Sequence, residues 1–305
     1  MSYTNKTLAE LNVLDDFLMN AIVTTPKLGE EFCRMSLSVL LQRKIGKIKV
    51  LSQRMIPPFT PEHRGIRMDV EIQEFEAEDE ESEPVNIYDL EPNLRKRVHL
   101  PRHNRFYQAK IDARHLKSGE DDFLKMPNLY VITITNYDPF GYGYMMYRIK
   151  NQCMEVSDLC YDDGLEFIYF YTGGSKGGNE DIRTMLNYFQ NSRKENATDK
   201  ATEELNEIVE QVRNLPEVRN EYMTLGDIID CEREEAAEEA AAKALKDALI
   251  SCILTYFKKQ GDIPTGLQEK LEETGDAAQL QSWYELALET KEVTEFMRLI
   301  GCNSI

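Results

Sequence analysis

Two carboxylates and a nearby amide stand at spacings that suit metal-dependent chemistry on phosphate esters. Asp69 occurs in RMDV, Glu91 in YDLEPN, and Asn93 follows two residues later. Side chains at i and i+2 of a strand share a face, so Glu91 and Asn93 should project together. If a strand from Ile66 to Glu71 lies alongside, Asp69 and Glu91 converge on one cation. Because magnesium prefers oxygen ligands and often takes only one or two carboxylates, this pattern predicts a Mg²⁺ site for phosphodiester hydrolysis, with Mn²⁺ as a substitute.

The helices and strands predicted around this pair indicate a mixed α/β domain. Apolar residues recur at helical spacing, and a β-branched run is typical of a central strand. The expected helices are Thr7 to Val23, Phe32 to Leu41 and Asn179 to Gln190, and the expected strands are Leu129 to Thr135 and Tyr144 to Ile149. The glycine-rich GGSKGG lacks the spacing of a phosphate-binding loop, which predicts a flexible connection instead.

Six strings in the first two thirds of the chain, taken in order, resemble the PD-(D/E)XK nuclease superfamily and, within it, the recombination-promoting nucleases, which are also described as transposases. They are LNVLDDFLMNAI, RGIRMDVEI, YDLEPN, RFYQAKIDARHLKSGED, LYVITITNYDPFGYG and YTGG. The resemblance implies a restriction-endonuclease-like α-β-β-β-α-β core with a mixed sheet, in which Asp69 and Glu91 bind the metal. Asp16, on the first helix, matches a further acidic position of the family and is a third candidate ligand.

One position departs from the superfamily pattern, which ends in Glu-x-Lys. Asn93 stands where the lysine is expected, and a neutral amide can hydrogen-bond to water but cannot supply a positive charge. Gln108, on the next helix, matches a position where some relatives carry a functional glutamine and could share the placement of water. Two functions therefore stay open: a Mg²⁺-dependent DNA endonuclease, and a catalytically weakened relative that serves as a DNA-binding or protein-interaction module.

The charge distribution bears on DNA as a partner. The net charge is −18, but residues 193–305 hold 13 Lys+Arg against 25 Asp+Glu, so most of the excess acid lies in the tail. A basic run from Leu94 to Lys117 carries eight Lys or Arg and one acid. Such a run is often only a solvated face, but its position after Glu91 also suits phosphate contact. The candidate DNA-binding residues are Arg95, Lys96, Arg97, Arg102, Arg105 and Tyr107.

Composition divides the chain into a nuclease-like domain, residues 1–192, and an acidic helical region, residues 193–305. In the second region Leu245, Leu249, Cys252 and Tyr256 form a stripe on one long helix. This stripe predicts either a homodimer through the C-terminal helices or packing within one chain. The six cysteines form no CxxC pair, and no apolar run is long enough to span a bilayer, so we expect a cytoplasmic protein without membrane contact.

Overall fold

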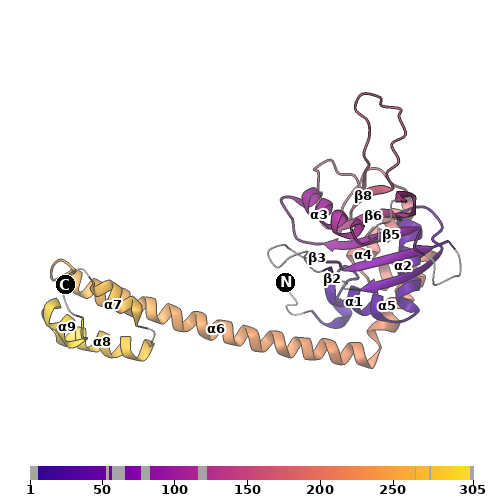
Figure 1. Cartoon of the computed structure of the whole chain (residues 1–305). Helices are drawn as coiled ribbons and strands as arrows, with labels where there is room; N and C mark the ends of the chain where they lie inside the picture. The colour runs from indigo at the N-terminus through magenta and orange to yellow at the C-terminus, as the bar shows by residue number, and fades with distance from the viewer. Residues whose placement is uncertain are drawn as a thin grey trace. The chain divides into compact units, whose positions relative to one another are not determined.

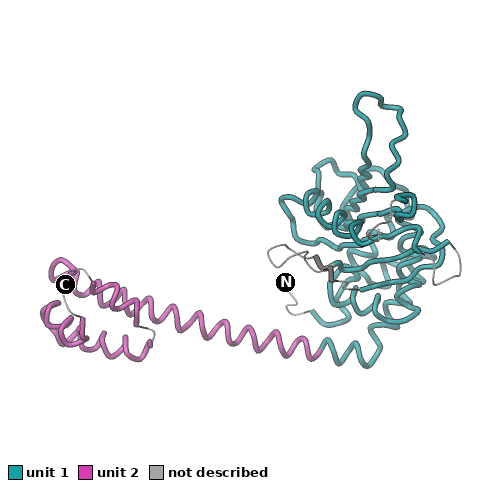
Figure 2. The backbone as a smooth tube through the Cα atoms, viewed as in Figure 1, with its two compact units in different colours: residues 1–222 teal, residues 223–305 magenta. Residues whose placement is uncertain are grey.

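The computed structural model describes residues 6–52, 55–56, 66–76, 83–115, 122–264, 266–274 and 276–302. The chain forms two compact units, Met1–Tyr222 and Met223–Ile305 (Figure 2). The boundary expected after residue 192 lies inside the first unit, because the helix that follows it packs there. This helix, α5 (Lys200–Arg213), contacts α1 (Asp16–Thr24), α2 (Leu28–Leu40) and α4 (Glu180–Gln190).

A six-stranded mixed sheet forms the centre of the first unit, with the strand order β1-β4-β5-β6-β8-β7 (Figure 1). The pairs β1/β4, β4/β5 and β7/β8 are antiparallel, whereas β5, β6 and β8 run parallel. The strands are β1 (Lys47–Ser52), β4 (Val70–Phe75), β5 (Asn86–Asn93), β6 (Asn128–Thr135), β7 (Met146–Ile149) and β8 (Leu165–Tyr171). This architecture confirms the predicted mixed α/β class.

Helices cover both faces of this sheet. On one face lies α3 (Leu100–Asp112), whose Ile111 packs in a buried cluster with Ile87 of β5 and Leu129 of β6. On the other, α1, α2, α4 and α5 pack together as a second layer, in which Phe32 of α2 stacks on Phe189 of α4. Because side chains alternate along each strand, residues of β5 with odd numbers point toward α3 and those with even numbers toward the second layer.

The strand expected from Ile66 to Glu71 is interrupted, so this prediction is wrong in detail. Its first two residues form β3 (Ile66–Arg67), which pairs with β2 (Met55–Ile56), and β4 begins only at Val70. The interruption has a simple cause, since the segments before and after it pair with different strands. Asp69 consequently lies immediately before β4 and does not end a strand.

The segment GGSKGG is a loop that leads into α4, as the sequence predicts. Its glycines serve the backbone, because Gly177 and Gly178 adopt φ values of 65° and 68°. A Cβ on Gly174 would lie 2.3 Å from the Cα of Met145, so the backbone at Met145 passes close to the loop. These glycines are therefore explained by turn geometry and close packing.

The second unit is a helical bundle with its own core. The end of α6 (Pro216–Lys258) packs with α7 (Leu267–Glu273), α8 (Ala277–Glu289) and α9 (Val293–Leu299). Of the predicted stripe, Leu249 is buried and Tyr256 packs against the core, but Leu245 and Cys252 are exposed. Ile253 and Phe257 fill the core beside them. The buried face of α6 is thus rotated from the predicted one and is covered by the same chain. Pairing of two chains through these helices stays a prediction.

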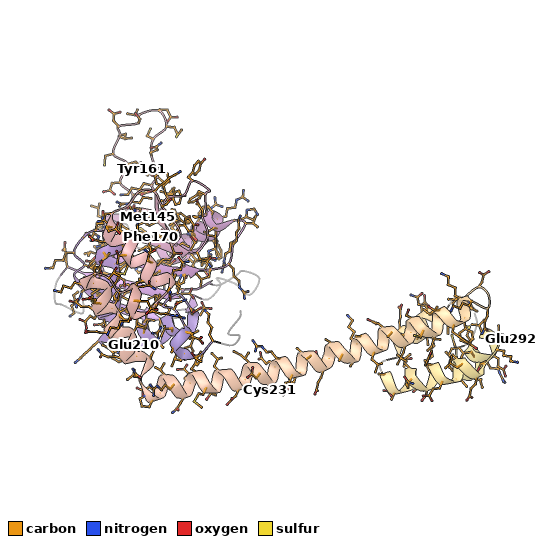
Figure 3. The ribbon with its side chains drawn as sticks, turned by 180° about the vertical axis from the view of Figure 1, so that it is seen from behind. Met145, Tyr161, Phe170, Glu210, Cys231 and Glu292 are labelled. Carbon is orange, nitrogen blue, oxygen red and sulfur yellow. The ribbon has the colours of Figure 1, made fainter. Side chains whose placement is uncertain are left out.

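Between its two ends, α6 runs as a largely exposed helix that includes Cys231 (Figure 3). After Cys231, thirteen of the sixteen residues 232–247 are Glu, Ala or Lys, which favour a helix. Among the helices described by the structure, none is both long enough and apolar enough to cross a bilayer.

Candidate metal centre

The structure brings the two predicted metal ligands together. In the antiparallel pairing of β4 with β5, Val70 lies opposite Leu90, which places Asp69 opposite Glu91. The backbone N–H of Asp69 donates a hydrogen bond to Oε1 of Glu91, with an N–O distance of 3.0 Å. Both residues belong to the face of the sheet that α3 covers, so the two carboxylates share one environment.

Two further carboxylates lie beside this pair. Glu71 is opposite Asp89 in the same ladder, and both side chains are fully buried. Asp69, just before β4, and Glu71 share a face of the sheet with Asp89 and Glu91 of β5, so four carboxylates occupy adjacent positions. Below we call these four residues the acidic cluster. Sequence reasoning missed Glu71 and Asp89, although their i+2 and i−2 spacing from Asp69 and Glu91 was a usable signal.

Two carboxylates of the acidic cluster, Glu91 and Asp89, have raised pKa values. Burial, together with the neighbouring Asp89 and Asp69, raises the pKa of Glu91 well above its usual value. Burial, Asp69 and Glu71 do the same to the pKa of Asp89. Arg114, just after α3, offsets part of this charge through an ion pair with Glu71, with Nη2 and Oε2 2.9 Å apart. The remaining excess of negative charge fits the binding of a divalent cation.

Glu74, a buried carboxylate on the opposite face of β4, has hydrogen-bond donors for its oxygens. Glu74 accepts hydrogen bonds from the Gly46 N–H at 2.7 Å and from Asn86 Nδ2 at 2.8 Å, and also from Tyr88. Burial alone would raise the pKa of Glu74, but these hydrogen bonds and the nearby Arg43 lower it instead. By contrast, neither carboxylate oxygen of Asp89 has a hydrogen-bond partner among the described residues.

Helix α3 covers the face of the sheet that carries the acidic cluster. Tyr107 is half-buried, and burial together with the negative charges of Glu91 and Asp89 raises its pKa to about 12. One turn earlier, Asn104 is buried and donates a hydrogen bond at 2.8 Å to Thr133, which lies beside Glu91 in the ladder of β5 and β6. These contacts fix α3 over the carboxylates.

Two other predicted site residues do not join this centre. Gln108 donates a hydrogen bond from Nε2 to Asp112, one turn further along α3, so its amide is directed along the helix. Asp16 is the exposed first residue of α1. Its role as a ligand and the role of Gln108 in placing water stay predictions.

Asn93 is buried and holds the chain that follows it. In the amide orientation that satisfies its neighbours, Asn93 donates to the carbonyl oxygen of Arg95 at 2.6 Å and accepts from Nε of Arg97 at 3.2 Å. Its amide thus orders the turn between β5 and α3. Arg97 also lowers the pKa of Tyr107, against the larger effects of burial and of the carboxylates.

The basic run divides into surface and interior parts. The predicted DNA-binding cations are all exposed, namely Arg95, Lys96, Arg97, Arg102 and Arg105. Lys110, in contrast, is buried, and Arg114 is paired with Glu71. Lys117 lies outside the described residues. Hydrophobic side chains interrupt the exposed part, where Val98 is 87% and Phe106 38% exposed. The free basic surface is therefore smaller than the sequence suggested.

The donor chemistry of this centre suits magnesium. Within the described parts of the chain, no three His, Cys, Asp or Glu side chains are placed to hold one metal ion jointly. Two carboxylates on neighbouring strands are nevertheless sufficient for Mg²⁺, which usually keeps several waters. Asp69 and Glu91 are the residues that could provide them.

No protein-family model matches the chain, and neither a curated protein nor a solved structure is significantly similar to it.

Proposed function

We propose that the protein is a Mg²⁺-dependent DNA endonuclease of the PD-(D/E)XK type, related to recombination-promoting nucleases and acting in the cytoplasm. One observation carries the proposal: Asp69 and Glu91 lie opposite each other on one face of the sheet, beneath α3. With the two-residue strands β2 and β3 left aside, the chain order α2, β1, β4, β5, α3, β6 also supports the proposal of an α-β-β-β-α-β core.

Each part of the centre has a task in this proposal. Asp69 and Glu91 hold the cation, which when bound polarises the phosphoryl group and makes water a better nucleophile. Arg95, Lys96 and Arg97 face solvent at the rim and bind the DNA backbone. Tyr107 stands over the carboxylates and limits access of bulk water.

Asn93 acts as a positioning residue in this arrangement. Its amide already bonds to the Arg95 carbonyl and the Arg97 side chain. We therefore assign it to orienting Arg97, whose guanidinium brings positive charge toward the centre from outside the sheet. A planar guanidinium can donate two parallel hydrogen bonds to two oxygens of one phosphate. Arg97 is therefore well suited to bind the substrate phosphate.

A second candidate function is a DNA-binding module without catalysis. Asn93 favours this function, because the superfamily pattern has a lysine at this position and the amide of Asn93 supplies no positive charge. The exposed basic residues would still bind phosphate in this case. Cleavage and binding must therefore be measured separately.

Replacing Glu91 by Gln should reduce cleavage to background, because the amide removes the ligand's charge while keeping its size. The test incubates the purified full chain with supercoiled plasmid, short duplexes and single strands, each with Mg²⁺, Mn²⁺ or EDTA. Glu207→Gln, on the exposed side of α5, is the matched control and should cleave as wild type does.

Three results are informative. Metal-dependent cleavage that Glu91→Gln removes supports the endonuclease. DNA binding without cleavage by the wild type, under every condition, selects the non-catalytic module. Cleavage that survives Glu91→Gln would show that the activity arises elsewhere and would reject this centre.

A further inference from the structure

Asp89 is buried in a way that a structural role does not explain. Its side chain is fully buried, and neither of its oxygens accepts a hydrogen bond from a described residue. Buried carboxylates in folded proteins are normally hydrogen-bonded, since an unsatisfied buried acceptor is costly. Glu74, on the same sheet, follows the rule with donors from Gly46, Asn86 and Tyr88.

The direction of the Asp89 side chain is fixed by the strand. Asp89 and Glu91 are two residues apart on β5, so both point toward α3, and Glu71 lies directly opposite Asp89. Asp69, opposite Glu91, is the diagonal neighbour of Asp89 and falls within side-chain reach across the ladder. The unsatisfied carboxylate is thus aimed into the acidic cluster that contains the two proposed metal ligands.

We propose that Asp89 is a third carboxylate of the cation site and strengthens cation binding by Asp69 and Glu91. No three carboxylates in the described residues converge on one point, so Asp89 acts on the cation from outside its ligand shell. Its two oxygens are buried and accept no hydrogen bond from a described residue, so no hydrogen bond compensates the negative charge of this carboxylate. That charge lies beside Asp69 and Glu91 and favours a divalent cation there.

This inference rests on the proposed function, since it needs a cation at Asp69 and Glu91. Groups that orient a metal ion from outside its ligand shell typically change its affinity by 10- to 100-fold. Asp89→Asn should therefore weaken cation binding by about tenfold. The amide has nearly the same shape as the carboxylate, so lost packing does not explain such a change.

The experiment measures Mn²⁺ binding to the full chain without DNA, by calorimetric titration and by the spectroscopic signal of free Mn²⁺. A salt concentration of about 0.15 M screens non-specific attraction to the acidic tail. Asp89→Leu is a second variant, because an apolar residue of similar size suits the neighbouring Ile87 and commonly keeps a buried site folded. Asp112→Asn is the matched control: it removes a half-buried carboxylate on α3 outside the acidic cluster and should leave affinity unchanged.

Each outcome decides one question. Weaker binding in a folded Asp89 variant, with wild-type affinity in Asp112→Asn, supports the inference. Wild-type affinity in a folded Asp89 variant overturns it, while loss of binding in Glu91→Gln still upholds the proposed centre. If the wild type binds no Mn²⁺, or Glu91→Gln binds it as well as the wild type, the proposed metal centre fails and the inference fails with it.

Discussion

Reversing Arg95, Lys96 and Arg97 to Glu should weaken DNA binding on the order of 100-fold at low salt, irrespective of sequence. Each cation that neutralises a phosphate releases a condensed counterion, and the logarithm of affinity then falls with the logarithm of salt concentration by about 0.9 per contact on duplex DNA. Loss of three contacts should flatten that slope by about 2.7 units. Fluorescence anisotropy of a labelled duplex over a salt series measures both quantities.

The matched control reverses three exposed lysines of the second unit, Lys243, Lys258 and Lys259. It changes net charge by the same amount but leaves the rim of the proposed centre intact, and it should keep the wild-type slope. An unchanged slope in the Arg95, Lys96 and Arg97 variant would mean that these side chains are only a solvated surface. Equal losses in both variants would point to net charge as the cause.

Alternation along a strand and the resemblance to the PD-(D/E)XK pattern together pointed to Asp69 and Glu91 as the central pair of the candidate site. Asp69 and Glu91 could be anticipated because alternation along a strand is fixed by backbone geometry, and the segment around Glu91 does form a strand. Which strands pair, and where each pairing ends, depends on tertiary structure and could not be predicted from the sequence. The partners of β4 end at Val70, so Asp69 lies in the break between two ladders.

The rest of the acidic cluster depended on knowing the register. Glu71 looked like an ordinary strand residue, and Asp89 was part of YDLEPN without an assigned task. Only the pairing of Glu71 with Asp89 makes four carboxylates neighbours. A one-residue shift would send one strand's pair to the opposite face, so composition alone cannot reveal the cluster.

Side-chain partners were equally hidden in the sequence. Asn93 was expected to place water, whereas its amide bonds to the Arg95 carbonyl and the Arg97 side chain. Gln108 was given a similar task, but it bonds to Asp112. Both residues are amides with several possible partners, and the partner is set by geometry that a spacing rule does not contain. In the tail, likewise, helical spacing predicted an apolar face, but α7 to α9 determined which face is buried.

Divalent cation should stabilise the first unit strongly at pH 8 and weakly at pH 5. The folded-state pKa values of Asp89 and Glu91 are raised, so the metal-free folded protein holds protons that the unfolded chain releases at lower pH. The stability that these protons contribute is fully present below the unfolded pKa values, roughly 4, and is lost as pH rises through the folded ones. A cation competes with these protons for the carboxylates. The stabilisation by the cation should therefore increase as the pH rises through the folded-state pKa values of Asp89 and Glu91.

The expected size follows from linkage. A cation present at 100 times its dissociation constant adds about 2.7 kcal/mol, which raises the Tm of a unit of this size by roughly 5–10 °C. Scanning calorimetry with Mg²⁺ or Mn²⁺ at both pH values measures the shift, and Glu91→Gln should abolish it at pH 8. The chain's single tryptophan, Trp283, packs on the core of the second unit, so its fluorescence follows that unit separately and should not respond to the cation. A shift that is as large at pH 5 as at pH 8 would mean that the cation binds away from the raised carboxylates.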